Sequence, residues 1–183
     1  CVTLFEEHKY LLENTKQILN SCHVDFEFNQ KVNRNLQIFG NSKKEDEAFL
    51  RKLCEANIGK RYVNASRKVK ERVEKELEAI IGLGFVSYFL INYDIIQYAR
   101  SKNYSFIGRG SGANSVVAYI LGITNVDPIE LDLYFERFIN SSRSSPPDFD
   151  LDFSWKDRED ITNYIFERYA HTALMGTYVT FKR

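Results

Sequence analysis

The stretch PDFDLDF, residues 147–153, alternates three aspartates with three large apolar side chains. A period of two is typical of a β-strand with one apolar face and one charged face. Three like charges on one face repel each other and resist desolvation. A pair of Mg²⁺ ions would neutralise them, because Mg²⁺ prefers hard oxygen ligands and two metals can serve a phosphoryl transfer. The alternative is a solvated edge strand whose acids guard against aggregation.

A glycine-rich turn lies upstream of the acids. Residues 105–107 predict a short strand, residues 108–115 read GRGSGANS, and the apolar run 116–121 predicts a helix. This arrangement directs backbone N–H groups and the positive end of a helix dipole at an anion. Ser111 can add a hydroxyl donor and Arg109 a charge. The spacing matches neither the P-loop nor the dinucleotide motif, so a phosphate loop competes with a tight turn that has no ligand.

Composition narrows the class of protein. A chain of 183 residues can bury one sizeable core and a small second unit. Its 25 basic and 25 acidic residues cancel, so net charge neither supports nor excludes a nucleic-acid partner. Three cysteines without CxxC spacing predict reduced thiols in a cytoplasmic protein and argue against zinc. No apolar run reaches the roughly 18 to 20 residues that span a bilayer, so we expect no membrane contact.

Apolar residues at helical spacing predict most of the remaining elements. The expected helices cover 4–22, 43–59, 66–81, 85–100, 128–140 and 156–170. The apolar face of the helix 4–22 is expected to pack in a core. Ser42 and Glu45 fit a capping box, and residues 25–40 predict a linker or domain boundary. A strand over 173–181 would complete a β-α-β unit around the acidic strand. The basic cluster from Lys60 to Arg72 fits either a phosphate backbone or, more commonly, a solvated helix face. Glu76 is expected on the charged outer face of the helix 66–81.

Two arginines and a tyrosine are candidate ligands of a phosphate-bearing substrate. Arg137 lies between two aromatics, eleven residues before Asp148, and could bind a triphosphate as a bidentate charge. Arg143, in the Ser/Pro-rich approach to the acids, is a second candidate. Tyr88 belongs to the apolar helix 85–100, and a buried tyrosine needs a partner for its hydroxyl.

Four motifs occur in one order along the chain, at 85–91, 108–113, 135–138 and 147–153. Together they resemble the palm domain of the bacterial DNA polymerase III alpha family, the C-family replicative polymerases. The resemblance runs from about residue 45 to the end. It implies an α/β (α+β) fold, with a polymerase-β-like nucleotidyltransferase palm core and an N-terminal helical segment. Residues 1–40 would be the exit from a PHP domain and residues 41–183 the first part of the palm.

The resemblance also implies roles for single residues. Asp148 and Asp150 would be the catalytic acids that hold two Mg²⁺ ions, and Asp152 matches a family acid that is not catalytic. The nucleotide-binding residues would be Tyr88, Arg109, Gly110, Ser111, Arg137 and Arg143. The stretch 140–146 departs from the family pattern, which affects the orientation of Arg143.

The implied activity is that of a DNA-directed DNA polymerase in chromosomal replication. A primer 3′-hydroxyl would attack the α-phosphate of a deoxynucleoside triphosphate on primer-template DNA. Sliding clamp, clamp loader and proofreading exonuclease would bind through regions outside this chain. The chain begins at Cys1 without a methionine, and the family's third catalytic aspartate would lie beyond Arg183. We therefore expect a piece of a longer polypeptide that cannot polymerise by itself.

Two other classes of function remain open from the residues. The chain could be a non-catalytic nucleic-acid or protein-binding module in which the acids are structural. It could also be a small-molecule nucleotidyltransferase, which would need a third carboxylate, and residues 173–183 place none well. Phosphoesterase activity of the PHP type is not expected, because the three histidines are scattered.

Overall fold

The computed structural model describes residues 5, 7–22, 38–136, 139, 146–169 and 172. The chain divides into two compact units, residues 1–32 and 33–183, and each is described by itself. In the first unit, α1 (Lys9–Ser21) confirms the predicted helix. None of its residues is buried, and Ile18 and Leu19 are largely exposed. The core packing expected for this helix is therefore absent from the described part of its unit, and the predicted boundary at residue 40 stays a prediction.

Three long helices begin the second unit, within a residue or two of the predicted bounds. They are α2 (Lys43–Arg61), α3 (Arg67–Gly82) and α4 (Val86–Ser101). The Ser42 side chain caps α2 by accepting from the Glu45 N–H at 3.3 Å. The Glu45 carboxylate accepts from Asn41, one residue before the position that a capping box uses. Ser66 caps α3 in the same way, through the N–H of Val69.

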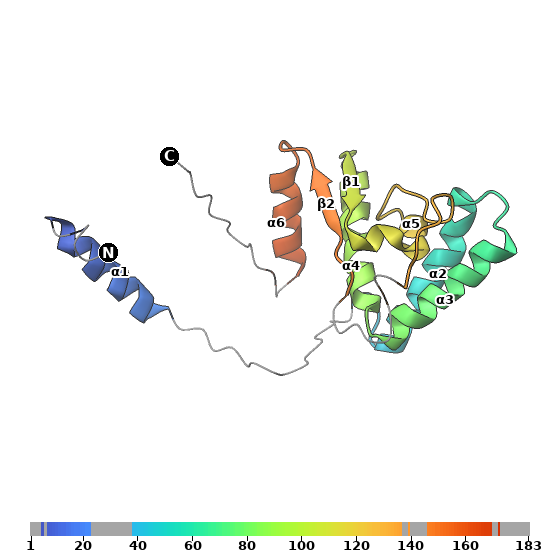
Figure 1. Cartoon of the computed structure of the whole chain (residues 1–183), viewed down its shortest axis with the longest axis horizontal. Coiled ribbons are helices and arrows are strands. Elements are labelled where there is room, and N and C mark those ends of the chain that lie inside the picture. Colours follow the sequence, from blue (N-terminus) through green and yellow to red (C-terminus); the bar gives the residue numbers. More distant parts are fainter. Residues whose placement is uncertain are drawn as a thin grey trace. The chain divides into compact units, whose positions relative to one another are not determined.

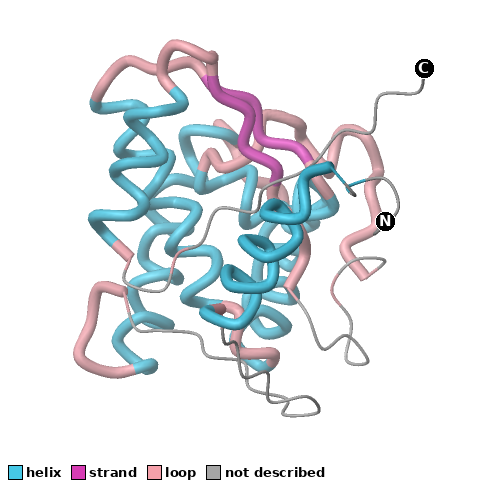
Figure 2. Tube along the Cα trace, turned by 90° about the vertical axis from the view of Figure 1, so that its left-hand side faces the viewer, coloured by secondary structure: helices cyan, strands magenta, loops and turns pink. Residues whose placement is uncertain are grey.

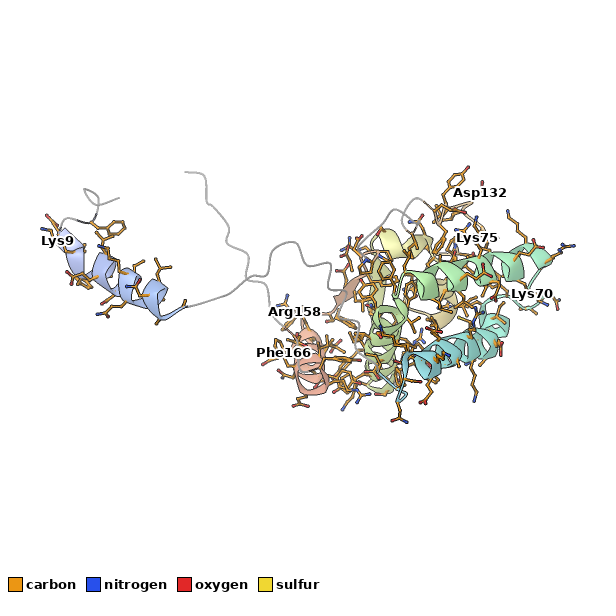
Figure 3. The ribbon with its side chains drawn as sticks, turned by 90° about the horizontal axis from the view of Figure 1, so that it is seen from below. Lys9, Lys70, Lys75, Asp132, Arg158 and Phe166 are labelled. Atoms are coloured by element: carbon orange, nitrogen blue, oxygen red, sulfur yellow. The ribbon has the colours of Figure 1, made fainter. Side chains whose placement is uncertain are left out.

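The main core forms where these helices meet the short helix α5 (Val116–Leu121). Phe89 and Leu90 of α4 are fully buried, as are Leu50 of α2 and Ile80 of α3. Burial of each such side chain contributes roughly 1.5–3 kcal/mol to folding. Every residue of α5 except Tyr119 is buried, so this helix is fixed on all sides. In Figure 3, Lys70 and Lys75 mark the solvent side of α3, away from this core.

In the described part of the chain, the sheet has two antiparallel strands, β1 (Phe106–Arg109) and β2 (Asp150–Phe153). Phe106 pairs with Phe153, and Arg109 pairs with Asp150. Figures 1 and 2 show the two strands side by side among the helices. The predicted strand 147–153 is thus shorter than expected, because residues 148 and 149 precede β2. The alternation itself is confirmed, since the three aspartates are exposed and the apolar residues between them are partly buried.

A second, smaller core lies between α4 and α6 (Arg158–Arg168). Ile95 and Ala99 of α4 pack with Ile161 of α6, and the apolar face of the strands covers them. Arg158 and Phe166 mark α6 in Figure 3. This packing fixes the face of the sheet that points inward, so the acids must face solvent.

The helix predicted over 128–140 is wrong for the part that the structure describes, where residues 128–136 form turns. The carboxylate of Asp127 accepts from the N–H of Ile129 at 2.8 Å. Asp132 then adopts a left-handed conformation with φ of 50°, which no helix interior accommodates. The predicted strand 173–181 lies outside the described residues, so the β-α-β unit stays a prediction.

The described part of the chain is mostly helical with a small sheet, which is compatible with an α/β class. Among the described residues, no single helix is both long enough and apolar enough to cross a membrane; α3 and α4 pass that test only as a pair, bent by 112°.

Candidate active site

The structure brings the glycine-rich turn of residues 108–115, here called the Gly-Ser loop, into contact with Asp148. Ser111 and Asp148 are 37 positions apart in sequence. The Ser111 hydroxyl donates to Oδ1 of Asp148, and the Ser111 N–H donates to Oδ2 at 3.2 Å. In return, the Asp148 N–H donates to Ser111 Oγ at 3.1 Å. The Gly112 N–H completes the contact by donating to the Asp148 carbonyl at 2.9 Å. Four hydrogen bonds therefore hold the backbone and side chain of Asp148 on the loop.

Two glycines of the loop lie so close to the acidic stretch that neither position has room for a side chain. Gly110 has a φ of +92°, and a Cβ there would lie 2.5 Å from the Asp148 carbonyl oxygen. A Cβ on Gly112 would lie 2.1 Å from the ring of Phe149. Real Cβ atoms essentially never approach so closely, so both glycines permit the close contact between loop and strand.

The loop differs in one respect from the predicted phosphate cradle. Residues 111–114 form a short 3₁₀ helix, η2 (Ser111–Asn114). The first two N–H groups of this helix, those of Ser111 and Gly112, are bound by Asp148. The Asp148 carboxylate accepts from the Ser111 N–H and the Asp148 backbone carbonyl accepts from the Gly112 N–H, so one residue of the protein itself occupies the N-terminus of η2.

Tyr88 of α4 fixes the residue between the two acids. Its hydroxyl accepts from the Phe149 N–H at 3.1 Å, and its ring stacks on Phe149 with centroids 5.5 Å apart. Burial raises the pKa of the Tyr88 hydroxyl, the Phe149 hydrogen bond opposes this, and the Asp148 carboxylate adds to the rise. The hydroxyl is therefore neutral at physiological pH, and the partner that the sequence left open is the backbone of the acidic stretch.

The exposed face of the sheet carries an ion pair. Nε of Arg109 lies 2.5 Å from Oδ2 of Asp152. The hydrogen bond from Arg109 and its charge lower the pKa of Asp152, and the same contact raises the pKa of Arg109. Asp152 therefore has a partner on the neighbouring strand. Arg109, predicted as a mobile charge for a phosphate, points along the sheet to this acid.

Asp148 and Asp150 have the chemistry of a partial Mg²⁺ site. Both carboxylates are exposed and two residues apart on an extended chain, so they face the same side. Within the described part of the chain, Asp150 has no hydrogen-bond partner for its carboxylate, and no group of three or more Asp, Glu, His or Cys is placed to hold a metal. Mg²⁺ is commonly held by one or two carboxylates together with waters and substrate phosphates. The two acids fit such an ion, with further ligands required from elsewhere.

Comparison with known families places this geometry in context. Residues 48–183 match the family described as the bacterial DNA polymerase III alpha NTPase domain. The chain belongs to the bacterial DNA polymerase III alpha family. The matched range includes the Gly-Ser loop and both acids, which are the two parts of the site that the structure joins.

Curated relatives of this polymerase III alpha family member carry two kinds of name. An error-prone DNA polymerase of Pseudomonas aeruginosa is 42% identical over 175 residues, covering 92% of this chain and 17% of that protein. A DNA polymerase III subunit alpha of Halalkalibacterium halodurans is 41% identical over 168 residues, covering 91% and 15%. An error-prone DNA polymerase of Ruegeria pomeroyi is 37% identical over 187 residues, covering 98% and 16%. The chain thus spans less than a fifth of the length of these relatives.

Two predicted site residues of this family member, Arg137 and Arg143, lie outside the described residues. Their roles stay predictions. The residues that the structure does bring together are Tyr88, Gly110, Ser111 and Asp148, while Asp150 follows on the same face.

Sequence reasoning placed Glu76 on the outer face of its helix, and this was wrong. Glu76 belongs to α3, and its side chain is fully buried against the N-terminus of α5. Its carboxylate accepts from Arg72 Nε at 2.7 Å, from Ser115 Oγ at 2.8 Å and from the Val117 N–H at 3.1 Å. Burial raises the pKa of Glu76, and the hydrogen bonds from Val117 and Arg72 oppose the rise.

The burial of Glu76 has a physical reason and left a signal in the sequence. A buried carboxylate is tolerated when donors surround it, and here a helix N-terminus and an arginine supply them. The signal was its position, since Glu76 falls on the apolar stripe of Val69, Val73 and Ile80 at helical spacing. Arg72 also donates to the carbonyls of Asn114 and Leu133. This pair therefore positions the segment that follows the Gly-Ser loop.

Proposed function

We propose that the chain is the first part of the catalytic palm of a DNA-directed DNA polymerase. The observation that carries this proposal is the contact of the Gly-Ser loop with Asp148, in a chain of this family. Asp148 and Asp150 would hold the Mg²⁺ ions. When bound, the ions would supply Lewis-acid activation of a primer 3′-hydroxyl and neutralise charge on the departing pyrophosphate.

The chain's own residues would prepare the acids for this task. Ser111 sets the side-chain orientation of Asp148 through its hydroxyl and its N–H. The Phe149 ring points inward, where it stacks on Tyr88 and fills the space that Gly112 leaves free. With Phe149 fixed, the alternation of the extended chain turns Asp148 and Asp150 to the same side. Positioned carboxylates cost less reorganisation when a substrate arrives.

The nucleotide would bind beside these acids. We assign Gly110 and Ser111 to the triphosphate, with Tyr88, Arg109, Arg137 and Arg143 as further contacts. Because Asp148 holds the N–H groups of η2 in this structure, the triphosphate would have to share the Ser111 hydroxyl or displace the carboxylate from it. Arg109 would likewise exchange its pairing with Asp152 for a phosphate oxygen.

The substrates would be primer-template DNA and deoxynucleoside triphosphates, in the bacterial cytoplasm. Sliding clamp, clamp loader and proofreading exonuclease would bind through other parts of the whole protein. The relatives are named both as error-prone polymerases and as polymerase III alpha subunits. The replicative role is therefore the part of the proposal that rests on the four sequence motifs.

Metal binding tests the proposal on the chain itself. Mn²⁺, a paramagnetic substitute for Mg²⁺, would be titrated against the chain and against the Asp148→Asn, Asp150→Asn double variant. We expect weak binding by the unaltered chain and its loss in the double variant. Asp132→Asn is the control, because Asp132 is exposed and its left-handed backbone suits asparagine. Equal Mn²⁺ binding by all three proteins would contradict the proposal.

A non-catalytic binding module is the second candidate, and one observation favours it. The backbone and side chain of Asp148 are already satisfied by the loop, as in a structural contact. On this hypothesis the double variant would lose folding stability without any change in metal affinity. Thermal unfolding measured beside the Mn²⁺ titration separates the two. Primer extension by the 183-residue chain in Mg²⁺ would contradict our expectation that this piece is inactive alone.

A further inference from the structure

A polar pocket of about 300 Å³ lies at the opposite end of α5 from the Gly-Ser loop. The last turns of α2 and α4 line it, together with the C-terminal end of α5. The polar side chains of the lining are Asn57, Lys60, Arg61, Tyr93, Gln97 and Arg100. Among the described residues, no carboxylate belongs to this lining, so the described lining has three positive charges and no negative one.

The three cations have neutral partners. Lys60 Nζ lies 2.9 Å from Oδ1 of Asn57, and the guanidinium of Arg61 lies over the Tyr119 ring at 4.6 Å. Arg100 donates to the Gly122 carbonyl at 3.1 Å. Among the described residues, none of the three forms an ion pair. Burial lowers the pKa of Arg100, and so does the nearby charge of Arg61.

A structural explanation accounts for part of this charge. Cations near a helix C-terminus offset the negative end of its dipole, and three helices end here. Each terminus corresponds to roughly half a unit of negative charge, so the three offset about 1.5 of the three positive charges. A net positive charge remains, in a concave site whose other polar groups include the Tyr93 hydroxyl and two side-chain amides. These are donors suited to an oxyanion with several acceptor oxygens.

We propose that this pocket binds a phosphate group, carried either by a nucleic-acid backbone or by a free phosphate compound. Lys60 and Arg61 would supply mobile charge and Arg100 a fixed donor. The site is separate from the proposed nucleotide site, because Ser111 lies before the N-terminus of α5 and the pocket lies at its C-terminus. The choice of nucleic acid as the source rests on the proposed function, whereas phosphate binding does not.

The test uses two ligands in the presence of a chelator, so that metal bound at Asp148 and Asp150 makes no contribution. Inorganic phosphate and a short single-stranded oligodeoxynucleotide are titrated against the chain, with amide chemical shifts as the readout. We expect shifts at the ends of α2 and α4 with both ligands. The Lys60→Gln, Arg61→Gln variant should lose the phosphate-induced shifts. Its oligonucleotide affinity should fall several-fold, with a salt slope reduced by about 0.7 for each lost phosphate contact.

The matched control is Lys44→Gln, Lys52→Gln, which removes two exposed charges from the same helix outside the pocket. Equal loss in control and test variants would overturn the proposal, because affinity would then follow net charge alone. Phosphate-induced shifts confined to the Gly-Ser loop would also overturn it. Loss of phosphate binding with unchanged oligonucleotide binding would support the site and assign it to a free phosphate compound. Lys60→Gln alone provides a second variant if the double one unfolds, since Lys60 contacts its own helix.

Discussion

At the scale of single residues, the candidate site depends on two glycines whose positions have no room for a side chain. Gly112 leaves the space that the Phe149 ring fills, and Gly110 allows the Asp148 carbonyl to approach the loop. Neither contact is visible in a motif, because a glycine pattern shows where backbone freedom is used and not what occupies the space. The structure identifies the occupant in both cases as the acidic stretch.

Gly112→Ala should destabilise the chain and weaken metal binding together. The added Cβ meets ring carbons at 2.1 to 2.7 Å, and such overpacking typically costs about 1–3 kcal/mol. Gly59→Ala is the control, since nothing lies within 4 Å of its Cβ and it sits within α2; it should stabilise the chain by roughly 0.5–1 kcal/mol. Denaturant unfolding measures the change in stability of both variants, and Mn²⁺ titration measures the change in metal binding. An unchanged midpoint for Gly112→Ala would contradict the close contact.

Glu76→Gln should destabilise the chain although it preserves shape. Arg72, Ser115 and Val117 all donate to this carboxylate, and an amide offers one acceptor oxygen where the carboxylate offers two. One buried donor would be left unpaired, which costs about 1–3 kcal/mol. Glu74→Gln, on the same helix, removes an exposed pair with Arg51 and should change the free energy of unfolding by less than about 1 kcal/mol. Equal effects of the two substitutions would refute the buried role of Glu76.

At the scale of elements, α6 is held on α4 by tyrosine hydroxyls. Asp94 of α4 accepts from Tyr164 and Tyr169, each at 2.7 Å. Asp160 of α6 accepts from Tyr98 at 2.9 Å, and the rings of Tyr98 and Tyr164 stack at 3.8 Å. The contact between these helices is therefore polar at its rim and apolar at its centre.

Alkaline pH should release this contact. Burial and the hydrogen bond to Asp94 raise the pKa of Tyr164 from 10.0 to about 12. Since the folded pKa exceeds the unfolded one, this contribution to stability is complete below pH 10.0 and is lost as the pH rises through about 12. Phenolate absorbance followed with unfolding should show tyrosine titrating in that window, and Tyr164→Phe should reduce its amplitude by one tyrosine. Titration of every tyrosine near its ordinary pKa would contradict the prediction.

The elements themselves were largely predictable, and the exceptions have identifiable causes. The period of apolar residues located α2, α3, α4 and α5 to within a residue or two, because burial against one core imposes that period. The pattern failed over 128–136, where Asp127 binds backbone N–H groups and Asp132 takes a left-handed conformation. Periodicity does not register such local competition by aspartate. Periodicity also does not register hydrogen-bond partners, and for this reason Glu76 was expected on the outer face of α3.

At the scale of the whole molecule, the chain consists of two units. A chain that begins at residue 33 should retain the thermal unfolding midpoint of the second unit, because no residue of α1 is buried. Differential scanning calorimetry of the shortened and complete chains would test this. A lower midpoint for the shortened chain would show that residues 1–32 stabilise the rest.

The pairing of β1 with β2 has a consequence for the order of folding. Next to these strands, Ser111 contacts Asp148, which lies 37 positions further along the chain. This contact must close a long loop before it can stabilise the fold. Within each of the helices α2 to α5 the backbone hydrogen bonds join residues about four positions apart, so the single helices can form first. The acids would then reach the loop late, and substitutions at Ser111 should accelerate unfolding far more than they slow refolding. A nascent chain would complete the proposed metal site only in the last step of its folding.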